Sequence, residues 1–195
     1  MDVKETIRIR RSFRSLDPVQ ITKDLITELA KSAQMAPSCK NSQPWRFVFV
    51  YNEDQLKKLF TSIIPGNQWI QRASMIIVVF SNMKNDCIIK ERLYYLFDTG
   101  IATGFLILRA TELGLVAHPI AGFEENIVKK ILEIPHDMRI ISLIIIGKKS
   151  NKVYPELTDL MKKTEARRPG RFPLKDFIYT NKFNQFEFED FSNIK

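Results

Sequence analysis

The sequence predicts an α+β fold in which helices flank a central sheet. Short apolar segments typical of strands alternate with segments of helical periodicity. The run over 139–147 is rich in isoleucine and leucine, which favours a strand at the centre of the sheet. The chain has 195 residues, with no internal repeat and no low-complexity segment. A single domain over 1–195 is therefore expected.

The first half of the chain is interpreted as a series of helices and strands with clear boundary signals. Thr22 and Asn52 stand where helix N-caps are expected, and Gln55 follows Asn52 at capping-box spacing. The strand at 75–80 has consecutive apolar residues, so both of its faces should be buried. The predicted elements are a helix over 3–15, a helix over 22–33, a strand over 45–51, a helix from Asn52, a short helix over 67–73 and a strand over 75–80.

The second half is predicted to contain one long helix, one shorter helix and one strand. The long helix spans 86–113 and ends before Gly114, a residue typical of helix C-termini. Its apolar residues cover most of its circumference, so we expect it at the core or at a subunit interface. A helix over 124–132 and the strand over 139–147 follow.

The last segment, 150–195, differs from the body because it is polar, then basic, then rich in phenylalanine. Exposed aromatic side chains are unfavourable in water, so an arm packed on the body or on a partner subunit is expected. A partly disordered tail is the alternative. The aromatic residues in question are Phe172, Phe177, Phe183, Phe186, Phe188 and Phe191.

The net charge of +8 permits binding to a nucleic acid or a membrane surface. No nucleic-acid motif accompanies it, and no apolar stretch is long enough to span a bilayer. A basic surface with a local anion site is the preferred interpretation, with neither nucleic acid nor membrane as a partner. Cys39 and Cys87 lie in no metal-binding or redox motif, so two free thiols are expected. Together with the absence of a secretory signal, they favour a cytoplasmic location.

The segment from Arg10 to Arg14 is the first candidate for binding chemistry. On the predicted helix, Arg10 and Arg14 lie one turn apart, with Ser12 between them. Two guanidinium groups and a hydroxyl can hold a phosphate through charge-assisted hydrogen bonds. A solvated basic face is the alternative, and the segment alone does not decide between them.

A polar loop over 36–44 is the second candidate. Pro37 and Pro44 stiffen it, and Ser38, Asn41 and Gln43 offer hydrogen-bond donors and acceptors. This suits recognition of the polar edge of a planar heterocycle. An ordinary loop that satisfies its own backbone is the alternative. His118 and His136 are isolated, and no side chain resembles a dedicated nucleophile or a metal centre.

These segments together resemble the FMN-dependent nitroreductase family. Arg-Arg-Ser-Phe-Arg at 10–14 and Ala-Pro-Ser-Cys-Lys-Asn-Ser-Gln-Pro-Trp at 36–45 resemble its opening. Asp-Thr-Gly-Ile-Ala at 98–102, Glu-Leu-Gly-Leu at 112–115 and Pro-Ile-Ala-Gly-Phe at 119–123 continue the match in the same order. The resemblance covers about 6–178. It implies a mostly antiparallel sheet and an intertwined homodimer, with the long helix at its centre and FMN sites at the subunit interface.

The resemblance also implies roles for individual residues. The N-terminal segment would hold the FMN phosphate, the 37–41 positions would reach the flavin from the other subunit, and the 119–122 segment would lie over the ring. Arg171 would return to the phosphate, with Arg168 as the second choice. The implied cofactor-binding residues are Arg10, Arg11, Ser12, Arg14, Pro37, Ser38, Asn41, Asn67, Pro119, Ala121, Gly122, Arg168 and Arg171.

The implied activity is hydride transfer from NADH or NADPH through the flavin to a small-molecule acceptor such as a nitroaromatic or a quinone, by a ping-pong mechanism. A related dehalogenase or flavin-destroying synthase, and a flavin-binding protein without turnover, are the alternatives. Two positions depart from the family pattern. Ile70 stands where many members have lysine, and Ala121 where some have glutamate. A missing lysine would alter the redox potential of a bound flavin.

Overall fold

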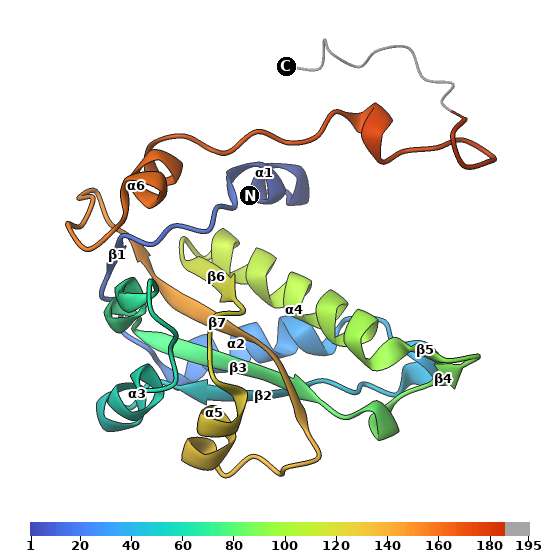
Figure 1. Ribbon diagram of the computed structural model, residues 1–195, viewed down its shortest axis with the longest axis horizontal. Coiled ribbons are helices and arrows are strands. Elements are labelled where there is room, and N and C mark those ends of the chain that lie inside the picture. Colours follow the sequence, from blue (N-terminus) through green and yellow to red (C-terminus); the bar gives the residue numbers. More distant parts are fainter. Residues whose placement is uncertain (186–195) are drawn as a thin grey trace.

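The computed structural model of the protein describes residues 1–185 and has the predicted α+β fold (Figure 1). The α-helices are α1 (Val3–Ile9), α2 (Lys23–Gln34), α3 (Glu53–Phe60), α4 (Tyr94–Glu112), α5 (Glu125–Leu132) and α6 (Asp159–Ala166). The strands are β1 (Leu16–Asp17), β2 (Arg46–Val50), β3 (Met75–Ser81), β4 (Ile88–Ile89), β5 (Arg92–Leu93), β6 (Val116–Ile120) and β7 (Arg139–Lys149). Short 3-10 turns are η1 (Cys39–Asn41), η2 (Gln68–Arg72), η3 (Met83–Asn85) and η4 (Leu174–Asp176).

Strand β7 is the centre of a five-stranded sheet, as its isoleucine-rich sequence predicts. Strand β3 pairs with one edge of β7, and β2 pairs with the outer edge of β3. Strands β6 and β1 pair successively with the other edge of β7. Every pairing is antiparallel, which confirms the expected sheet type.

Helices cover both faces of this sheet (Figure 1). Every residue of β3 is buried, and alternate residues point to opposite faces because the side-chain period of a strand is two. Ile76 and Val78 pack in the cluster that contains residues of α3 and α5, whereas Ile77 and Val79 pack with residues of α2 and α4. The predicted burial of this strand on both faces is confirmed.

Several local signals have the structural role that the sequence indicates. The Thr22 hydroxyl accepts a hydrogen bond from Leu25 N, 3.1 Å away, and so caps α2. The Asn52 side chain caps α3 by accepting from the backbone of Asp54 and Gln55. Gly114 follows α4 with φ +77°, a conformation that glycine adopts without steric cost.

Two predicted helices are shorter than expected. Helix α1 ends at Ile9, and residues 10–15 run as extended chain, so Arg10 and Arg14 do not share a helix face. The predicted 86–113 helix begins only at Tyr94, because residues 88–93 form the β4–β5 hairpin. Lys90 and Glu91 make its turn with φ of 48° and 69°. In residues 10–15, hydrogen bonds to Glu165 and His118 take the place of the backbone hydrogen bonds of a helix.

The expectation of two free thiols is wrong. Cys39 and Cys87 form a disulfide whose Cα atoms lie 6.0 Å apart, across a sequence separation of 48 residues. Neither cysteine belongs to a recognisable motif, and only the tertiary fold brings Cys39 of η1 beside the chain that leads into β4. The thiol argument for a cytoplasmic location is thereby lost.

The C-terminal segment has two parts. Helix α6, which the sequence analysis did not predict, packs on the body through the buried side chain of Glu165. The chain beyond it runs past α1 and away from the body (Figure 1). Phe172, Phe177 and Phe183 are exposed there, and Phe186, Phe188 and Phe191 lie outside the described residues. Within 1–185, no helix combines the length and apolar character needed to cross a bilayer.

Candidate functional site

The N-terminal arginines and the C-terminal basic residues lie together, although about 160 residues separate them in sequence. Arg168 Nη2 donates to the carbonyl oxygens of Arg8 and Arg10, each 2.7 Å away. Arg10 Nη1 donates to the Ser12 hydroxyl at 3.1 Å. Burial, followed by the charges of Arg168 and Arg171, lowers the pKa of Arg10. The cluster is thus held together against its own charge repulsion.

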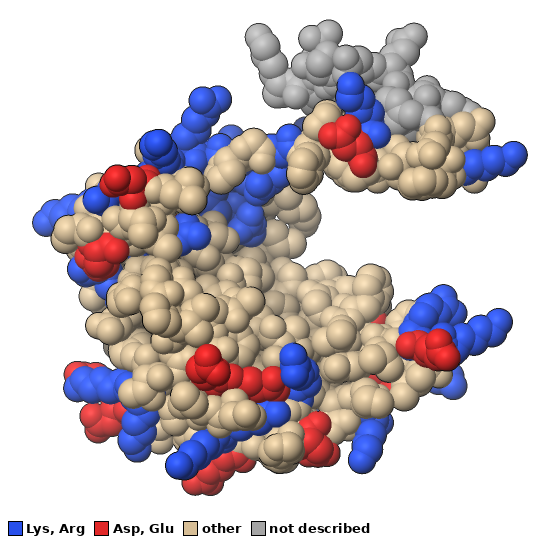
Figure 2. All heavy atoms as spheres, viewed as in Figure 1, with Lys and Arg blue, Asp and Glu red and all other residues tan. Residues whose placement is uncertain are grey.

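None of the ion pairs within residues 1–185 includes Arg10, Arg168 or Arg171. A bound anion would relieve the repulsion between them. Figure 2 shows Lys and Arg side chains gathered around α1 and α6, above a part of the body with few charges. Both features indicate an anion site at this place.

Arg11 and Arg14 connect the same segment to α6. Arg11 Nη2 donates to the carbonyls of Thr164 and Glu165 at the end of α6, at 2.6 and 3.1 Å. The Glu165 carboxylate accepts from the backbone N–H groups of Arg14 and Ser15, at 2.8 and 3.1 Å. The Arg14 guanidinium donates to the Thr164 hydroxyl at 3.3 Å. Arg11 therefore stabilises the junction with α6, whereas Glu165 fixes the backbone that carries Arg14.

His118 of β6 supports the arginine segment from the sheet side. Its Nδ1 lies 3.0 Å from the carbonyl oxygen of Phe13, and its ring stacks on Trp69 with 4.6 Å between centroids. Burial, aided by the charges of Arg14 and Arg10, lowers the pKa of His118 to about 4. The imidazole is therefore neutral at pH 7, and Nδ1–H donates to Phe13. The sequence analysis assigned His118 no role, because a single histidine shows no sign of the carbonyl and the ring that it contacts in the fold.

The Asn67 side chain lies against Gly122, which follows the end of β6. A Cβ atom on Gly122 would lie 2.5 Å from Asn67 Nδ2 and 2.9 Å from the Ile64 side chain, so a larger residue would displace these two side chains. The Asn67 Oδ1 atom accepts from Trp69 Nε1 at 3.2 Å, which links Asn67 to the His118 stack. Ile70, where the resemblance leads one to expect a lysine, is buried in the apolar core and is uncharged.

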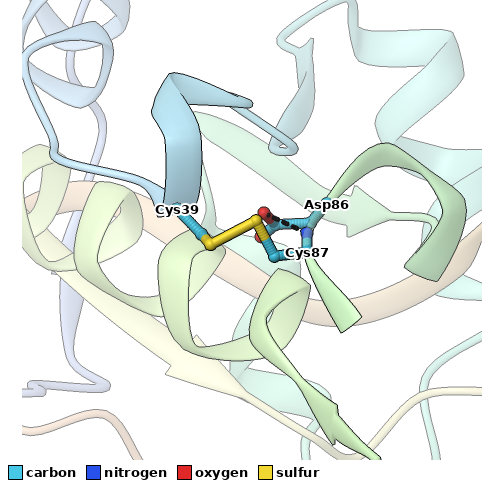
Figure 3. A group of neighbouring side chains, drawn as sticks. All are labelled: Cys39, Asp86 and Cys87. Atoms are coloured by element: carbon cyan, nitrogen blue, oxygen red, sulfur yellow. Dashed lines mark hydrogen bonds between the residues drawn. A yellow bond between two sulfur atoms is a disulfide. The ribbon is translucent and has the colours of Figure 1, made fainter. Parts of the chain in front are cut away.

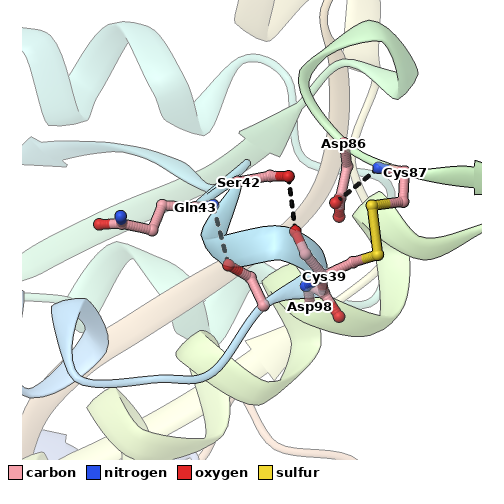
Figure 4. Close-up of a disulfide and its surroundings, with 7 residues drawn as sticks. Cys39, Ser42, Gln43, Asp86, Cys87 and Asp98 are labelled. Atoms are coloured by element: carbon pink, nitrogen blue, oxygen red, sulfur yellow. Dashed lines mark hydrogen bonds between the residues drawn. A yellow bond between two sulfur atoms is a disulfide. The ribbon is translucent and has the colours of Figure 1, made fainter.

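The 37–43 loop forms a separate group. Ser38 Oγ accepts from Gln43 N at 2.9 Å, and Cys39 N donates to the Asp98 carboxylate at 2.6 Å (Figure 4). Lys40, Asn41 and Gln43 have φ of 51°, 57° and 49°. No hydrogen bond or ion pair within residues 1–185 joins this loop to the arginine segment. The candidate residues therefore form two groups in one chain.

Comparison with known proteins decides the family. The sequence profile of the Nitroreductase family matches residues 7–68 and 65–148, most of the body of the chain. The chain belongs to the Nitroreductase family. It is therefore an oxidoreductase by family, and the predicted resemblance is confirmed.

Individual relatives agree with this assignment. An Archaeoglobus fulgidus protein, provisionally named NADH dehydrogenase/NAD(P)H nitroreductase, is 31% identical over 78% of this chain and 89% of its own length. An iodotyrosine deiodinase of Haliscomenobacter hydrossis is 27% identical over 80% of this chain and 82% of its own length. A solved structure described as an oxidoreductase containing FMN superposes with a TM-score of 0.81 at 27% identity and covers 95% of both chains.

Proposed function

We propose that this nitroreductase-family protein is an FMN-dependent oxidoreductase that transfers hydride from NADH or NADPH to a small acceptor such as a nitroaromatic or a quinone. The main support for this proposal is the anion site, in which Arg10, Arg168 and Arg171 lie together without a carboxylate partner. FMN fits it because its phosphate is a dianion that guanidinium groups bind through charge-assisted hydrogen bonds.

The remaining residues of the same group fit the rest of the cofactor. Gly122 carries no side chain, so its backbone can approach a flat ring closely. Asn67 lies beside it with an amide that can hydrogen-bond a heterocycle edge. Pro119 and Ala121 are exposed at the same strand end. Arg10, Ser12 and Arg14 would hold the phosphate, and Arg168 or Arg171 would complete its charge balance.

Bound FMN would supply the hydride-transfer chemistry. The protein's part is to bind and orient. His118 and Glu165 hold the arginine segment in place, and Gly122 adds no side chain beside the proposed ring position. Alternating occupation of one site by nicotinamide and acceptor, a ping-pong scheme, follows if both reach the same exposed ring face.

We also propose a homodimer with composite sites. Leu96, Phe97 and Phe105 are exposed on α4, and Gly100 and Gly104 of the same helix have open space around them. Next to α4, a cavity of about 410 Å³ lies open among α1, α2 and α4. An apolar helix face of this extent favours a subunit interface. A partner would then bring its 37–43 loop, with Pro37, Ser38 and Asn41, to the arginine group.

Flavin titration tests the phosphate site. The full chain should bind FMN with quenching of flavin fluorescence, and the double change Arg10→Ala/Arg14→Ala should weaken binding at least about a hundredfold, because two charge-assisted hydrogen bonds are lost. Lys4→Ala/Arg8→Ala removes the same charge from exposed positions of α1 and should bind normally. Equal weakening in both variants would show that net charge alone is responsible.

Mixed dimers test the composite site. We expect chains with Arg10→Ala/Arg14→Ala and chains with Ser38→Ala/Asn41→Ala to bind FMN poorly alone. A heterodimer of the two should regain one FMN site per dimer. One of its sites combines the intact arginine segment of one chain with the intact loop of the other, and both altered groups lie in the second site. A heterodimer that stays empty while each parent folds would contradict sites shared between subunits.

Reductive dehalogenation of an aromatic substrate is the second candidate, because two iodotyrosine deiodinases are among the relatives. Assays with both nicotinamides against nitrofurazone, menadione and iodotyrosine distinguish the two. Acceptor-dependent nicotinamide oxidation with the first two supports the reductase. Iodide release as the main reaction supports the dehalogenase, and FMN binding with no turnover of any acceptor would leave only a flavin-binding protein.

A further inference from the structure

The Cys39–Cys87 disulfide joins two parts of the protein that lie 48 residues apart in sequence. Cys39 begins η1, between Ser38 and Asn41, and Cys87 precedes the β4–β5 hairpin that leads into α4 (Figure 3). Both cysteines are half-buried, so neither is sealed in the core. The bond therefore connects the candidate binding loop to a hairpin, at a position that a small reductant can reach.

The loop holds an unfavourable backbone conformation. Three of its residues, Lys40, Asn41 and Gln43, have positive φ although none is glycine. Such residues persist only where the surrounding structure fixes them. Most of the loop's hydrogen bonds are internal, including Asn41 N to Ser38 O at 3.0 Å. Internal bonds move with the loop and cannot hold it in place.

Within residues 1–185, few connections lead from residues 38–43 to other elements. Cys39 N donates a hydrogen bond to Asp98 of α4, and the disulfide joins Cys39 to Cys87 (Figure 4). At the other end of the loop, Arg46 Nη1 of β2 donates to the carbonyl oxygen of Gln43 at 3.1 Å. If the disulfide opens, only such hydrogen bonds keep the loop in its strained form, and relaxation becomes easier.

The surroundings of the two sulfur atoms are acidic. A carboxylate oxygen of Asp86 and both sulfur atoms lie within 4.8 Å of one another (Figure 3). Asp98 lies beside Asp86, and burial, followed by the charge of Asp98, raises the pKa of the Asp86 carboxyl. Acidic neighbours disfavour the thiolate, the species that attacks a disulfide. A reduced pair would therefore close slowly by itself, so that both states can persist.

We propose that Cys39–Cys87 is a reversible redox clamp on the 37–43 loop: the disulfide holds Ser38 and Asn41 in the binding conformation, and its reduction releases the loop and weakens flavin binding. The effect on flavin rests on the proposed function, whereas the effect on the loop does not. Reduction is thiol–disulfide exchange with a dithiol. The dithiol supplies two electrons and two protons, itself becomes a disulfide, and leaves two thiols on the protein.

Hydrogen exchange and flavin titration on the full chain test the clamp, with dithiothreitol as reductant and a chelator present. After reduction we expect amide exchange at 38–43 to accelerate and FMN affinity to fall, each about tenfold, while β3 stays protected. Re-oxidation with oxidised glutathione should restore both. Cys87→Ser, which lies outside the loop, should match the reduced protein and no longer respond to dithiothreitol. Met83→Ser, an exposed change in η3, should respond normally.

Three outcomes would overturn the clamp. If the disulfide were reduced only in denaturant, it would be a purely structural bond that stays closed in the native protein. Loop exchange that is equal in both redox states would show that Asp98 and the internal bonds suffice. Loosening of the loop with unchanged FMN affinity would separate the loop from flavin binding. A protein that binds no FMN in either state, yet loosens its loop on reduction, would instead contradict the proposed function alone.

Discussion

The two groups of candidate residues are held in place by different physics. The arginine segment, 10–15, is fixed by many polar contacts with distant elements: Glu165 and Thr164 of α6, and His118 of β6. The 37–43 loop has a strained backbone and is held by internal hydrogen bonds, by a hydrogen bond each to Asp98 and from Arg46, and by one covalent bond. The first group should therefore respond to changes of charge and pH. The second should respond to redox conditions. Four predictions test this difference.

Reduction of the disulfide should have the largest effect on stability. Cross-linking residues 48 apart removes conformational freedom from the unfolded chain, so its loss should lower the free energy of unfolding by about 4 kcal/mol. Urea denaturation with and without dithiothreitol measures this, with Cys87→Ser as the permanently reduced reference. Equal stability in both conditions would show that the bond does not form in solution.

Removal of the Glu165 carboxylate should have the next largest effect. Glu165→Ala leaves the buried N–H groups of Arg14 and Ser15 without acceptors, which should cost about 3 kcal/mol of stability. Glu165→Gln keeps one acceptor oxygen and should lose less. Thermal unfolding of the three proteins gives the order. A glutamine variant as unstable as the alanine variant would indicate that the charge matters more than the hydrogen bonds.

Acidification should weaken the arginine segment through His118. The pKa of His118 is about 4 in the folded protein and about 6.5 in an unperturbed histidine. Between these values the unfolded chain binds more protons than the folded protein, so the free energy of unfolding decreases as the pH is lowered. A pKa shift of this size lowers the free energy of unfolding by about 2 kcal/mol when the pH falls from 8 to 5. The difference in urea stability between wild type and His118→Gln isolates the contribution. His136→Gln, an exposed change, is the matched control. A parallel pH dependence of wild type and His118→Gln would contradict the assignment.

Loss of the internal loop bond should have the smallest effect. Ser38→Ala removes one neutral hydrogen bond, from Gln43 N, on an exposed loop and should cost about 1 kcal/mol or less. Its amide exchange at 38–43 should rise only slightly in the oxidised protein and more strongly after reduction. Purely additive effects would show that the disulfide and this bond act independently.

Local sequence patterns predicted most of the body correctly. Thr22, Asn52 and Gly114 mark helix ends because capping and positive φ depend on the residue itself and its nearest neighbours. The apolar runs of β3 and β7 predicted buried central strands. The motifs also predicted the family, and the arginine and loop segments remain the proposed binding residues.

The errors share one cause. Residues 10–15 and 88–93 have helical sequence patterns but other structures, because contacts with α6, β6 and the disulfide outweigh weak helix propensity. Strand β6 was missed because its pairing with β7 is not visible in its own short segment. Glu165 was missed because a glutamate near a chain end shows no sign of the two backbone groups that it will bind.

Residue order alone thus settles the apolar periodicity, the caps and the chemical character of the candidate binding segments, since each depends on a few neighbouring residues. Folding in three dimensions settles which of those segments meet. Arg10 beside Arg168, Asn67 against Gly122 and Cys39 bonded to Cys87 each join positions far apart in the chain. Such pairings arise from the packing of the whole sheet and its helices, and no local pattern encodes them.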